Sequence, residues 1–325
     1  MFSWKSTGRP IVALAPMAGV TDAPYRQFMK TICPETIVYT EFLSTDALHH
    51  GAAKTMKMIK FDPAIERPFI VQIFGNNREH FITSCKIIEE MGADGIDINM
   101  GCPAARVVSS CHGSALIRRP ELAVDLVHAA VNAVSIPVSV KTRLGWESSE
   151  TLIPFCQALE RAGASCLAIH GRTYKQKFSG EADWSPIYNL KRSVGIPVLG
   201  NGDVYSADDA LRLVGNLDGV MVGRGTMGNP WLLRDISLAL SSRKATSCVP
   251  ATLQEKVPFI LTHCELSVKY KGEQRGIMEM RKHFAGYVKG FDGAKEMRVR
   301  LMGAESIRDV EGILCRNLCK KCHAE

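Results

Sequence analysis

Cys102 stands in the stretch INMGCPAAR (98–106), on a turn that follows a short apolar run. Gly101 and Pro103 flank it, and Asn99 lies three positions before it. Cysteines of globular proteins are mostly buried among apolar side chains, so a thiol on a polar turn is a candidate reactive group. The residue types leave three roles open: a proton donor, a nucleophile or a buried structural thiol.

Polar or small residues also follow the other short apolar runs of the first 231 residues. In chain order these residues are Ala15-Pro16-Met17-Ala18-Gly19, Gln72, Asn99 with Cys102, Lys141 and Arg143, His170 and Arg172, Asn201-Gly202-Asp203, and Gly223-Arg224-Gly225. A single polar residue at a strand end is usually structural. Their convergence on one edge of a sheet favours a functional site.

The glycine-rich turns at 201–203 and 223–225 predict a phosphate site, because their backbone N–H groups can bind an anion and Arg224 adds charge. Residues 223–228 also satisfy the G-x-G-x-x-G pattern of dinucleotide-binding folds. We reject a dinucleotide site here, because residues 223–228 lie in the last β/α unit and no later strand ends in an acidic residue. A phosphorylated ligand is expected, with a cofactor as one candidate.

Lys141 has three interpretations. As an ammonium it stabilises negative charge on a cofactor ring; as a neutral amine it forms a Schiff base, as in barrel aldolases; as a structural group it pairs with a carboxylate across the barrel. Gln72 and His170 favour the first, because both side chains can hydrogen-bond a planar heterocycle.

Eight strand-like runs must position these residues: 11–17, 37–42, 69–75, 95–101, 138–143, 166–172, 197–203 and 219–225. Helix-like segments separate them, for example 77–92 and 121–134. This alternation predicts an α/β fold, a TIM (β/α)8 barrel, with a doubly wound sheet as the alternative because strand order is invisible in sequence.

Beyond Trp231 the pattern changes to helical spacing with basic faces, at 252–270, 277–290, 294–304 and 306–318. We therefore predict a barrel domain over 1–240, a linker over 241–252 and a small all-α domain over 253–325. Of the net charge of +7, almost all lies in residues 232–325. This distribution predicts a polyanionic partner for the helical domain.

Composition is that of an ordinary globular protein, with 46% hydrophobic and 22% charged residues. No apolar stretch reaches the length of a membrane span, so no membrane contact is expected. The N-terminus does not read as a signal peptide, and the 11 cysteines then favour reduced thiols in the cytoplasm.

Taken together, the motifs resemble those of the tRNA-dihydrouridine synthase family. The matching stretches are APMAGVTDAPYR (15–26), QIFGN (72–76), DINMGCPA (97–104), VKTRLGW (140–146), IHGRT (169–173), SGEADW (179–184), GNGDV (200–204) and GVMVGRGTMGNPW (219–231). They cover the barrel in the family's order, whereas the C-terminal region is similar only in being helical and basic. Ala105 and the Cys111-His112 pair depart from the family's pattern after the cysteine.

The resemblance implies an FMN-bound barrel and a tRNA-binding helical domain that together reduce the C5–C6 double bond of selected uridines in tRNA, with NADPH as the reductant. It places Pro16, Met17 and Ala18 along the flavin, and Gln72, Lys141 and His170 at its ring and ribityl chain. Asn201, Gly202, Asp203, Gly223, Arg224 and Gly225 would hold the chain and the phosphate. Asn99 would meet the uracil, and we also expect Arg143 and Arg172 to contact the substrate. Arg281, Lys282, His283, Arg298 and Arg300 are expected to contact tRNA phosphates.

The implied chemistry needs a hydride at C6 and a proton at C5 of the uracil. A thiol near its ordinary pKa of about 8.5 is mostly protonated at neutral pH, which favours Cys102 as the proton donor over a nucleophile. The alternatives are an FMN barrel acting on a free pyrimidine, as in dihydroorotate dehydrogenases, and a Schiff-base aldolase using Lys141.

Cys315, Cys319 and Cys322 have a C-x₃-C-x₂-C spacing that also occurs at iron–sulfur sites. Such a motif normally lies in an early barrel loop, and only the adjacent His323 could complete a zinc site. We therefore expect no metal.

Overall fold

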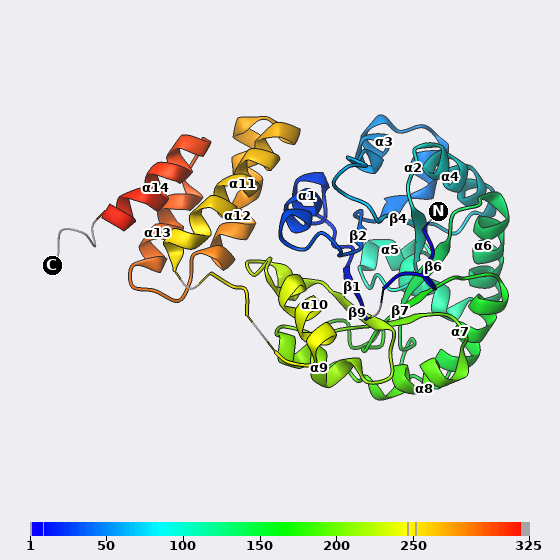
Figure 1. The fold of residues 1–325 in the computed structure, drawn as a ribbon. Helices are drawn as coiled ribbons and strands as arrows, with labels where there is room; N and C mark the ends of the chain where they lie inside the picture. The colour runs from blue at the N-terminus through cyan, green and yellow to red at the C-terminus, as the bar shows by residue number, and fades with distance from the viewer. Residues whose placement is uncertain (1, 9, 246, 251, 320–325) are drawn as a thin grey trace.

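A closed barrel of parallel strands forms the first two-thirds of the chain, and a group of helices packs against one side of it (Figure 1). This computed structural model describes residues 2–8, 10–245, 247–250 and 252–319. The barrel strands are β1 (Ile11–Leu14), β2 (Val38–Tyr39), β4 (Phe69–Phe74), β5 (Gly95–Asn99), β6 (Val138–Arg143), β7 (Leu167–His170), β8 (Val198–Asn201) and β9 (Gly219–Val222). The order β1-β9-β8-β7-β6-β5-β4-β2 is closed by a parallel bridge between Ala13 and Ile37. The predicted TIM barrel is confirmed.

Only residues 38–39 of the predicted strand over 37–42 form a strand, and a second short strand follows just beyond this range. β2 ends at Tyr39, and a separate strand β3 (Leu43–Ser44) pairs with the far end of β4. The hydroxyl Oγ1 of Thr40 accepts the backbone N–H of Gln72 at 3.0 Å. Because a side chain takes the place of a main-chain carbonyl there, the backbone ladder between β2 and β4 is interrupted.

Helices on the outside of the barrel connect the strands. They are α1 (Ala23–Ile32), α2 (Thr45–His49), α3 (Ala53–Ile59), α4 (Arg78–Glu90), α5 (Ala105–Ser109), α6 (Pro120–Ala133), α7 (Leu152–Arg161), α8 (Ser185–Ser193), α9 (Ala207–Val214) and α10 (Leu232–Ser242), with two 3₁₀ turns, η1 (Gly113–Arg118) and η2 (Arg224–Thr226). Local signals start several of them; Asn77 and Ser206, for example, cap α4 and α9 by accepting backbone N–H groups of the first turn. The aliphatic side chains between strands and helices form the main core.

The inside of the barrel has its own core. Trp4, Ile11, Tyr39, Ile70 and Leu199 belong to this buried cluster. Side chains alternate between the two faces of a strand, so residues two positions apart on a strand both point inward. Apolar side chains predominate in this inner core, and polar side chains gather at the carboxyl ends of the strands, where a site can form.

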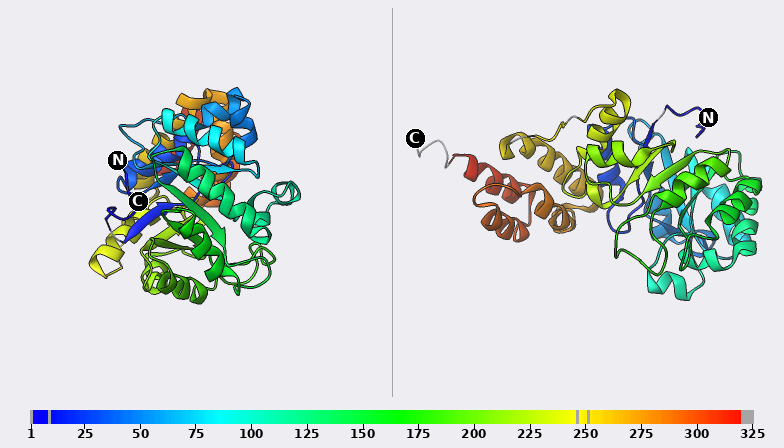
Figure 2. Two further views of the ribbon diagram at one scale, coloured as in Figure 1. Left: turned by 90° about the vertical axis from the view of Figure 1, so that its right-hand side faces the viewer. Right: turned by 90° about the horizontal axis from the view of Figure 1, so that it is seen from below.

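The last four helices are α11 (Leu253–Lys271), α12 (Glu273–Tyr287), α13 (Ala294–Met302) and α14 (Ile307–Cys319). A capping box of Thr252 and Glu255 starts α11. Their apolar core also takes in Phe28 and Ile32 of α1, so the helical region is continuous with one helix of the barrel. Figure 2 shows that this region projects from one side of the barrel.

His283 of α12 is buried in this junction, and the expectation that it contacts phosphate is wrong. It is 3% exposed and stacks on the ring of Tyr25 with centroids 5.2 Å apart. A neighbouring imidazole, that of His263, stacks on Phe28 at 4.6 Å. Burial lowers the pKa of both histidines, so they act as neutral packing groups between the barrel and the helices.

Among the described helices, none combines the length and hydropathy needed to span a bilayer. The C-x₃-C-x₂-C spacing, for which we expect no metal, lies partly outside the described residues, since neither Cys322 nor the side chain of Cys319 is included.

Candidate active site

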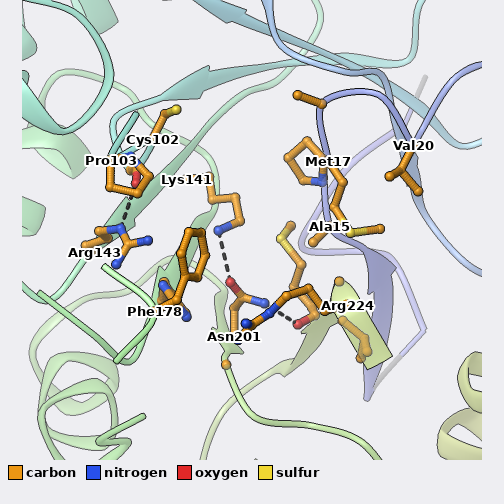
Figure 3. Close-up of a pocket in the computed structure, with 18 of the residues that line it drawn as sticks. Ala15, Met17, Val20, Cys102, Pro103, Lys141, Arg143, Phe178, Asn201 and Arg224 are labelled. Carbon is orange, nitrogen blue, oxygen red and sulfur yellow. Dashed lines mark hydrogen bonds between the residues drawn. The ribbon is translucent and has the colours of Figure 1, made fainter. Parts of the chain in front are cut away.

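A cavity of about 670 Å³ opens at the carboxyl ends of the barrel strands. Its volume is typical of sites that bind small molecules and cofactors. Nearly all of the predicted site residues line it: Pro16, Met17, Ala18, Gln72, Asn99, Cys102, Lys141, Arg143, His170, Asn201, Gly202, Asp203, Gly223, Arg224 and Gly225. Figure 3 shows Lys141 and Asn201 between Cys102, Arg143 and Phe178 on one side and Ala15, Met17 and Arg224 on the other.

The strand register brings these side chains together. Asn99 pairs with Lys141, and His170 pairs with both Arg143 and Asn201 across neighbouring strands. Asn99 and Lys141 belong to one register row, and Arg143, His170 and Asn201 belong to the next, so the four neighbouring strands β5 to β8 all contribute polar groups near their carboxyl ends. This is the geometric reason that residues 100 positions apart in the sequence share one cavity.

Cys102 is held by a side-chain turn at the end of β5. The amide oxygen Oδ1 of Asn99 accepts the backbone N–H of Gly101 at 3.1 Å and of Cys102 at 2.9 Å. Such a turn fixes the backbone that carries the thiol. Burial raises the pKa of Cys102 above its ordinary value, although Arg143 and Lys141 act in the opposite direction. The thiol is therefore protonated at neutral pH and can donate a proton.

A buried hydrogen-bonded chain supports that turn from below. Asn99 Nδ2 donates to Gln72 Oε1 at 3.0 Å, and Gln72 Nε2 donates to Asp97 Oδ2 at 2.7 Å. The hydroxyl of Ser139 donates to the other oxygen of Asp97, also at 2.7 Å. Burial raises the pKa of Asp97 to about 6. Asp97 thus fixes which way the Gln72 amide faces, and Gln72 fixes Asn99. This role of Asp97 was not predicted from the sequence.

Lys141 carries its ammonium into the centre of the cavity. Its Nζ donates to Asn201 Oδ1 at 3.0 Å, and Asn201 Nδ2 donates to the carbonyl of Met221 at 2.7 Å. Burial lowers the pKa of Lys141 to about 8, and the Arg143 guanidinium acts in the same direction. His170 stays neutral, because burial and the surrounding cations hold its pKa far below the usual range. The inner end of the cavity is therefore positively charged, and an anionic ligand bound there would stabilise the buried cations.

The turns after β8 and β9 leave room only for glycine. A Cβ on Gly225 would lie 2.5 Å from the carbonyl oxygen of Val204, and Gly202 has a φ of +121°. The hydroxyl of Tyr25 donates to the carbonyl oxygen of Thr226 at 3.1 Å and holds the second turn against α1. Close backbone turns beside an arginine, here Arg224, have the chemistry of a phosphate cradle.

Arg172 is the one predicted site residue that does not line the cavity, and its contact with the substrate stays a prediction. Arg172 is 3% exposed. Its guanidinium donates to the carbonyls of Ser179 and Gly180 and pairs with Asp203 at 2.7 Å. These contacts brace the loop after β7 against the turn after β8, a role that depends on loop partners the sequence pattern does not reveal.

Several lining residues were missed by the sequence analysis. Phe42, Phe178, Tyr205 and Met221 add apolar and aromatic surface to the cavity. Phe178 is 56% exposed and lies under the guanidiniums of Arg143 and Arg224, at 5.5 and 5.0 Å. The available sequence signal for it was an aromatic residue immediately before the SGEADW motif.

Residues 13–322 match the family model described as dihydrouridine synthase (Dus). The chain belongs to the dihydrouridine synthase family. It is 36% identical over 310 residues to a probable tRNA-dihydrouridine synthase 1 of Synechocystis, covering 93% of this chain and 85% of that protein. It is also 36% identical over 307 residues to tRNA-dihydrouridine synthase B of Pseudomonas putida, covering 92% of this chain and 88% of that protein.

Among solved structures, histamine dehydrogenase of Rhizobium sp. 4-9 is similar to this dihydrouridine synthase family member with a TM-score of 0.54 and 13% identity. The match covers 78% of this chain and 48% of that chain, so this chain spans about half the length of that protein. At this identity the similarity concerns the fold alone.

Proposed function

We infer that the chain is a tRNA-dihydrouridine synthase, an oxidoreductase that reduces the C5–C6 double bond of uridine in tRNA. The observation that carries this conclusion is the family match over nearly the whole chain, with the family's motifs gathered around one cavity. A Schiff-base aldolase is disfavoured by the same match. The matched relatives are named for action on tRNA, which disfavours a free pyrimidine as the substrate.

We propose FMN as the bound cofactor. The residues fit an elongated anionic molecule: the 223–225 turn and Arg224 suit its phosphate, Lys141 suits a ring that becomes anionic, and Gln72 offers an amide to the ring edge. When bound and reduced, FMN would supply the hydride for C6 of the uracil, and a hydride from NADPH would reduce the oxidised flavin again. The neutral imidazole of His170 can hydrogen-bond such a ring without adding charge.

Cys102 supplies the proton to C5 in this proposal. Its thiol is protonated because burial raises its pKa, and the Asn99 turn holds it at the mouth of the cavity. A general acid must lie within hydrogen-bond reach of the atom that it protonates, which a rigid turn favours. Asn99 keeps its carbonyl oxygen on the turn and its amino group on Gln72, so its contact with the uracil is made from a fixed position.

The uridine must leave its stack in folded tRNA to reach this cavity. We propose that basic residues of the helical region, among them Arg281, Lys282, Arg298 and Arg300, hold the surrounding phosphates. The division into units at 1–240, 241–252 and 253–325 is part of the same proposal, as is a cytoplasmic location, where tRNA and NADPH are both present.

The test uses purified protein, NADPH and an unmodified tRNA transcript. Mass spectrometry of the digested tRNA should detect dihydrouridine only when enzyme and NADPH are both present, and absorbance should detect bound flavin. Uridine monophosphate and orotate serve as control substrates. Reduction of these free pyrimidines with no change in the tRNA would contradict the proposal.

A further inference from the structure

A second cavity, of about 800 Å³, lies on the same rim of the barrel. The loops after β5, β6 and β7 form it, and we call it the Trp146 pocket. Its lining residues are Arg118, Trp146, Glu147, Tyr174, Lys175 and Lys177. Lys177 lines the candidate active site as well, so the two cavities are neighbours. None of the functions assigned above uses the Trp146 pocket.

An aromatic stack forms one wall of the Trp146 pocket. The rings of Trp146 and Tyr174 are parallel to within 19° with centroids 3.8 Å apart. The Arg118 guanidinium lies 5.0 Å from the indole centroid, and it must cover the other face because Tyr174 fills the first. The stack is therefore arginine, indole and phenol in order, and the phenol of Tyr174 stands at its end.

Backbone hydrogen bonds hold the stack in place before any ligand binds. The N–H of Tyr174 donates to the carbonyl of Gly145 at 2.9 Å, and the N–H of Lys175 donates to that of Trp146 at 3.0 Å. These bonds join the loops after β6 and β7 beyond the ends of the strands. A pre-arranged aromatic surface loses little conformational entropy when a ligand stacks on it.

The charge of the Trp146 pocket is positive. Lys175 pairs with Glu147 at 3.2 Å, which neutralises both. Arg118 and Lys177 remain as cations, and within the described part of the chain no ion pair engages the Lys177 ammonium. Aromatic surface beside uncompensated cations is the combination that binds single-stranded nucleotides, through base stacking and phosphate pairing.

Arg143 connects the Trp146 pocket to the turn that carries Cys102. Its Nε donates to the carbonyl of Gly101 at 2.7 Å, while Nη1 donates to those of Thr173 and Lys177 at 3.0 and 2.7 Å. One buried guanidinium therefore fixes the aromatic loop relative to the catalytic turn. A ligand held on the loop would be held at a fixed offset from the thiol.

The position around the barrel also suits RNA. Strands β6 and β7 lie three or four places around the ring from β1 and β2, between which α1 supports the helical region. The Trp146 pocket and the helical region thus stand on opposite sides of the mouth. A polynucleotide that lies across the mouth would meet both.

We propose that the Trp146 pocket binds a nucleotide adjacent to the uridine that is reduced, with its base stacked on Tyr174 and its phosphate paired with Lys177. This inference rests on the proposed function, because it places the neighbouring residue of the same tRNA. The pocket would hold the strand after the target base has left its stack, so that the base stays in the cavity beside Cys102.

The test compares Tyr174→Leu with Tyr174→Phe in the flavin-loaded enzyme. Tyr174→Leu should raise the KM for an unmodified tRNA transcript about tenfold, with a smaller effect on kcat, because a stacking surface is lost. Tyr174→Phe keeps the ring and should stay within about twofold of the native enzyme. Lys177→Gln should reduce the slope of log binding constant against log salt by about one, whereas Lys86→Gln, on the exposed face of α4, should leave it unchanged.

Three results would overturn the inference. An unchanged KM for tRNA in Tyr174→Leu excludes stacking of a base on this residue. An unchanged salt slope in Lys177→Gln excludes the phosphate contact. The Lys177 test remains available if Tyr174→Leu fails to fold. A rise in the KM for NADPH with that for tRNA unchanged would assign the pocket to the dinucleotide. A native enzyme that forms no dihydrouridine rejects the proposed function itself, which separates the two failures.

Discussion

Replacing Lys141 by methionine should stabilise the ligand-free protein while abolishing its activity. Burial lowers the pKa of this amine from 10.5 to about 8, so the folded protein holds the ammonium less favourably than the unfolded chain does. The difference corresponds to about 3 kcal/mol at pH 7. Methionine has a similar length and no charge, and it removes this penalty.

Two effects reduce the gain. Water in the open cavity solvates part of the ammonium, and the substitution leaves Asn201 Oδ1 without its donor at 3.0 Å, which costs about 1 kcal/mol. We therefore expect Lys141→Met to raise the free energy of unfolding by about 1–2 kcal/mol at pH 7. Urea denaturation of the flavin-free protein measures this directly.

The contribution of Lys141 to stability also depends on pH. Between about pH 8 and 10.5 the unfolded chain binds a proton at Lys141 that the folded protein has lost, so the stability contributed by this residue rises with pH over that window. From pH 8 to 10 the free energy of unfolding of the native protein should rise relative to that of the variant, so the difference between the two should shrink. A variant that is destabilised at pH 7, or that still forms dihydrouridine at the native rate, would refute the reasoning about this buried cation.

Three further predictions concern the thiol, the phosphate turn and the buried carboxylate. Cys102→Ala should keep its bound flavin, seen by absorbance, and lose about 10²- to 10⁴-fold in dihydrouridine formation, the usual contribution of a general acid; turnover near the native rate would remove the thiol from the mechanism. Gly225→Ala should weaken FMN binding at least tenfold in a fluorescence titration, because its Cβ would lie 2.5 Å from the Val204 carbonyl; unchanged affinity would place the phosphate elsewhere. Asp97→Leu leaves two buried donors without an acceptor, at a cost of about 2–6 kcal/mol, but it also removes a buried carboxylate whose raised pKa costs about 3 kcal/mol at pH 7, so the free energy of unfolding in urea should fall by no more than about 3 kcal/mol; a larger loss would show that the carboxylate is not disfavoured by its burial.

The barrel could be predicted because its signals are local. Each strand is a short apolar run, and period-two alternation carries the inward face to a polar end, as from Ile70 to Gln72 or from Leu199 to Asn201. The position of the cavity could be predicted for the same reason, because every strand of a parallel barrel ends at one rim. The split of the second strand could not be foreseen, because it depends on Thr40 reaching the backbone of Gln72.

Residues whose partners lie in loops were harder to assign. Arg172 has the residue type and strand position of a substrate contact, but two carbonyls of its own loop and Asp203 take its guanidinium. His283 sits on a basic helix in the sequence, yet it packs on Tyr25 once α12 meets α1. Asp97 was inconspicuous because nothing in the sequence shows that Gln72 and Ser139 meet it.

The most direct test of the central claim is a single-turnover experiment without oxygen. The flavin-loaded protein is reduced with one equivalent of NADPH and then mixed with an unmodified tRNA transcript, while flavin absorbance and dihydrouridine are followed together. The account predicts that the oxidised flavin spectrum returns as dihydrouridine appears, in equal amounts. Flavin that stays reduced in the presence of tRNA, or that is reoxidised with no dihydrouridine formed, would contradict it.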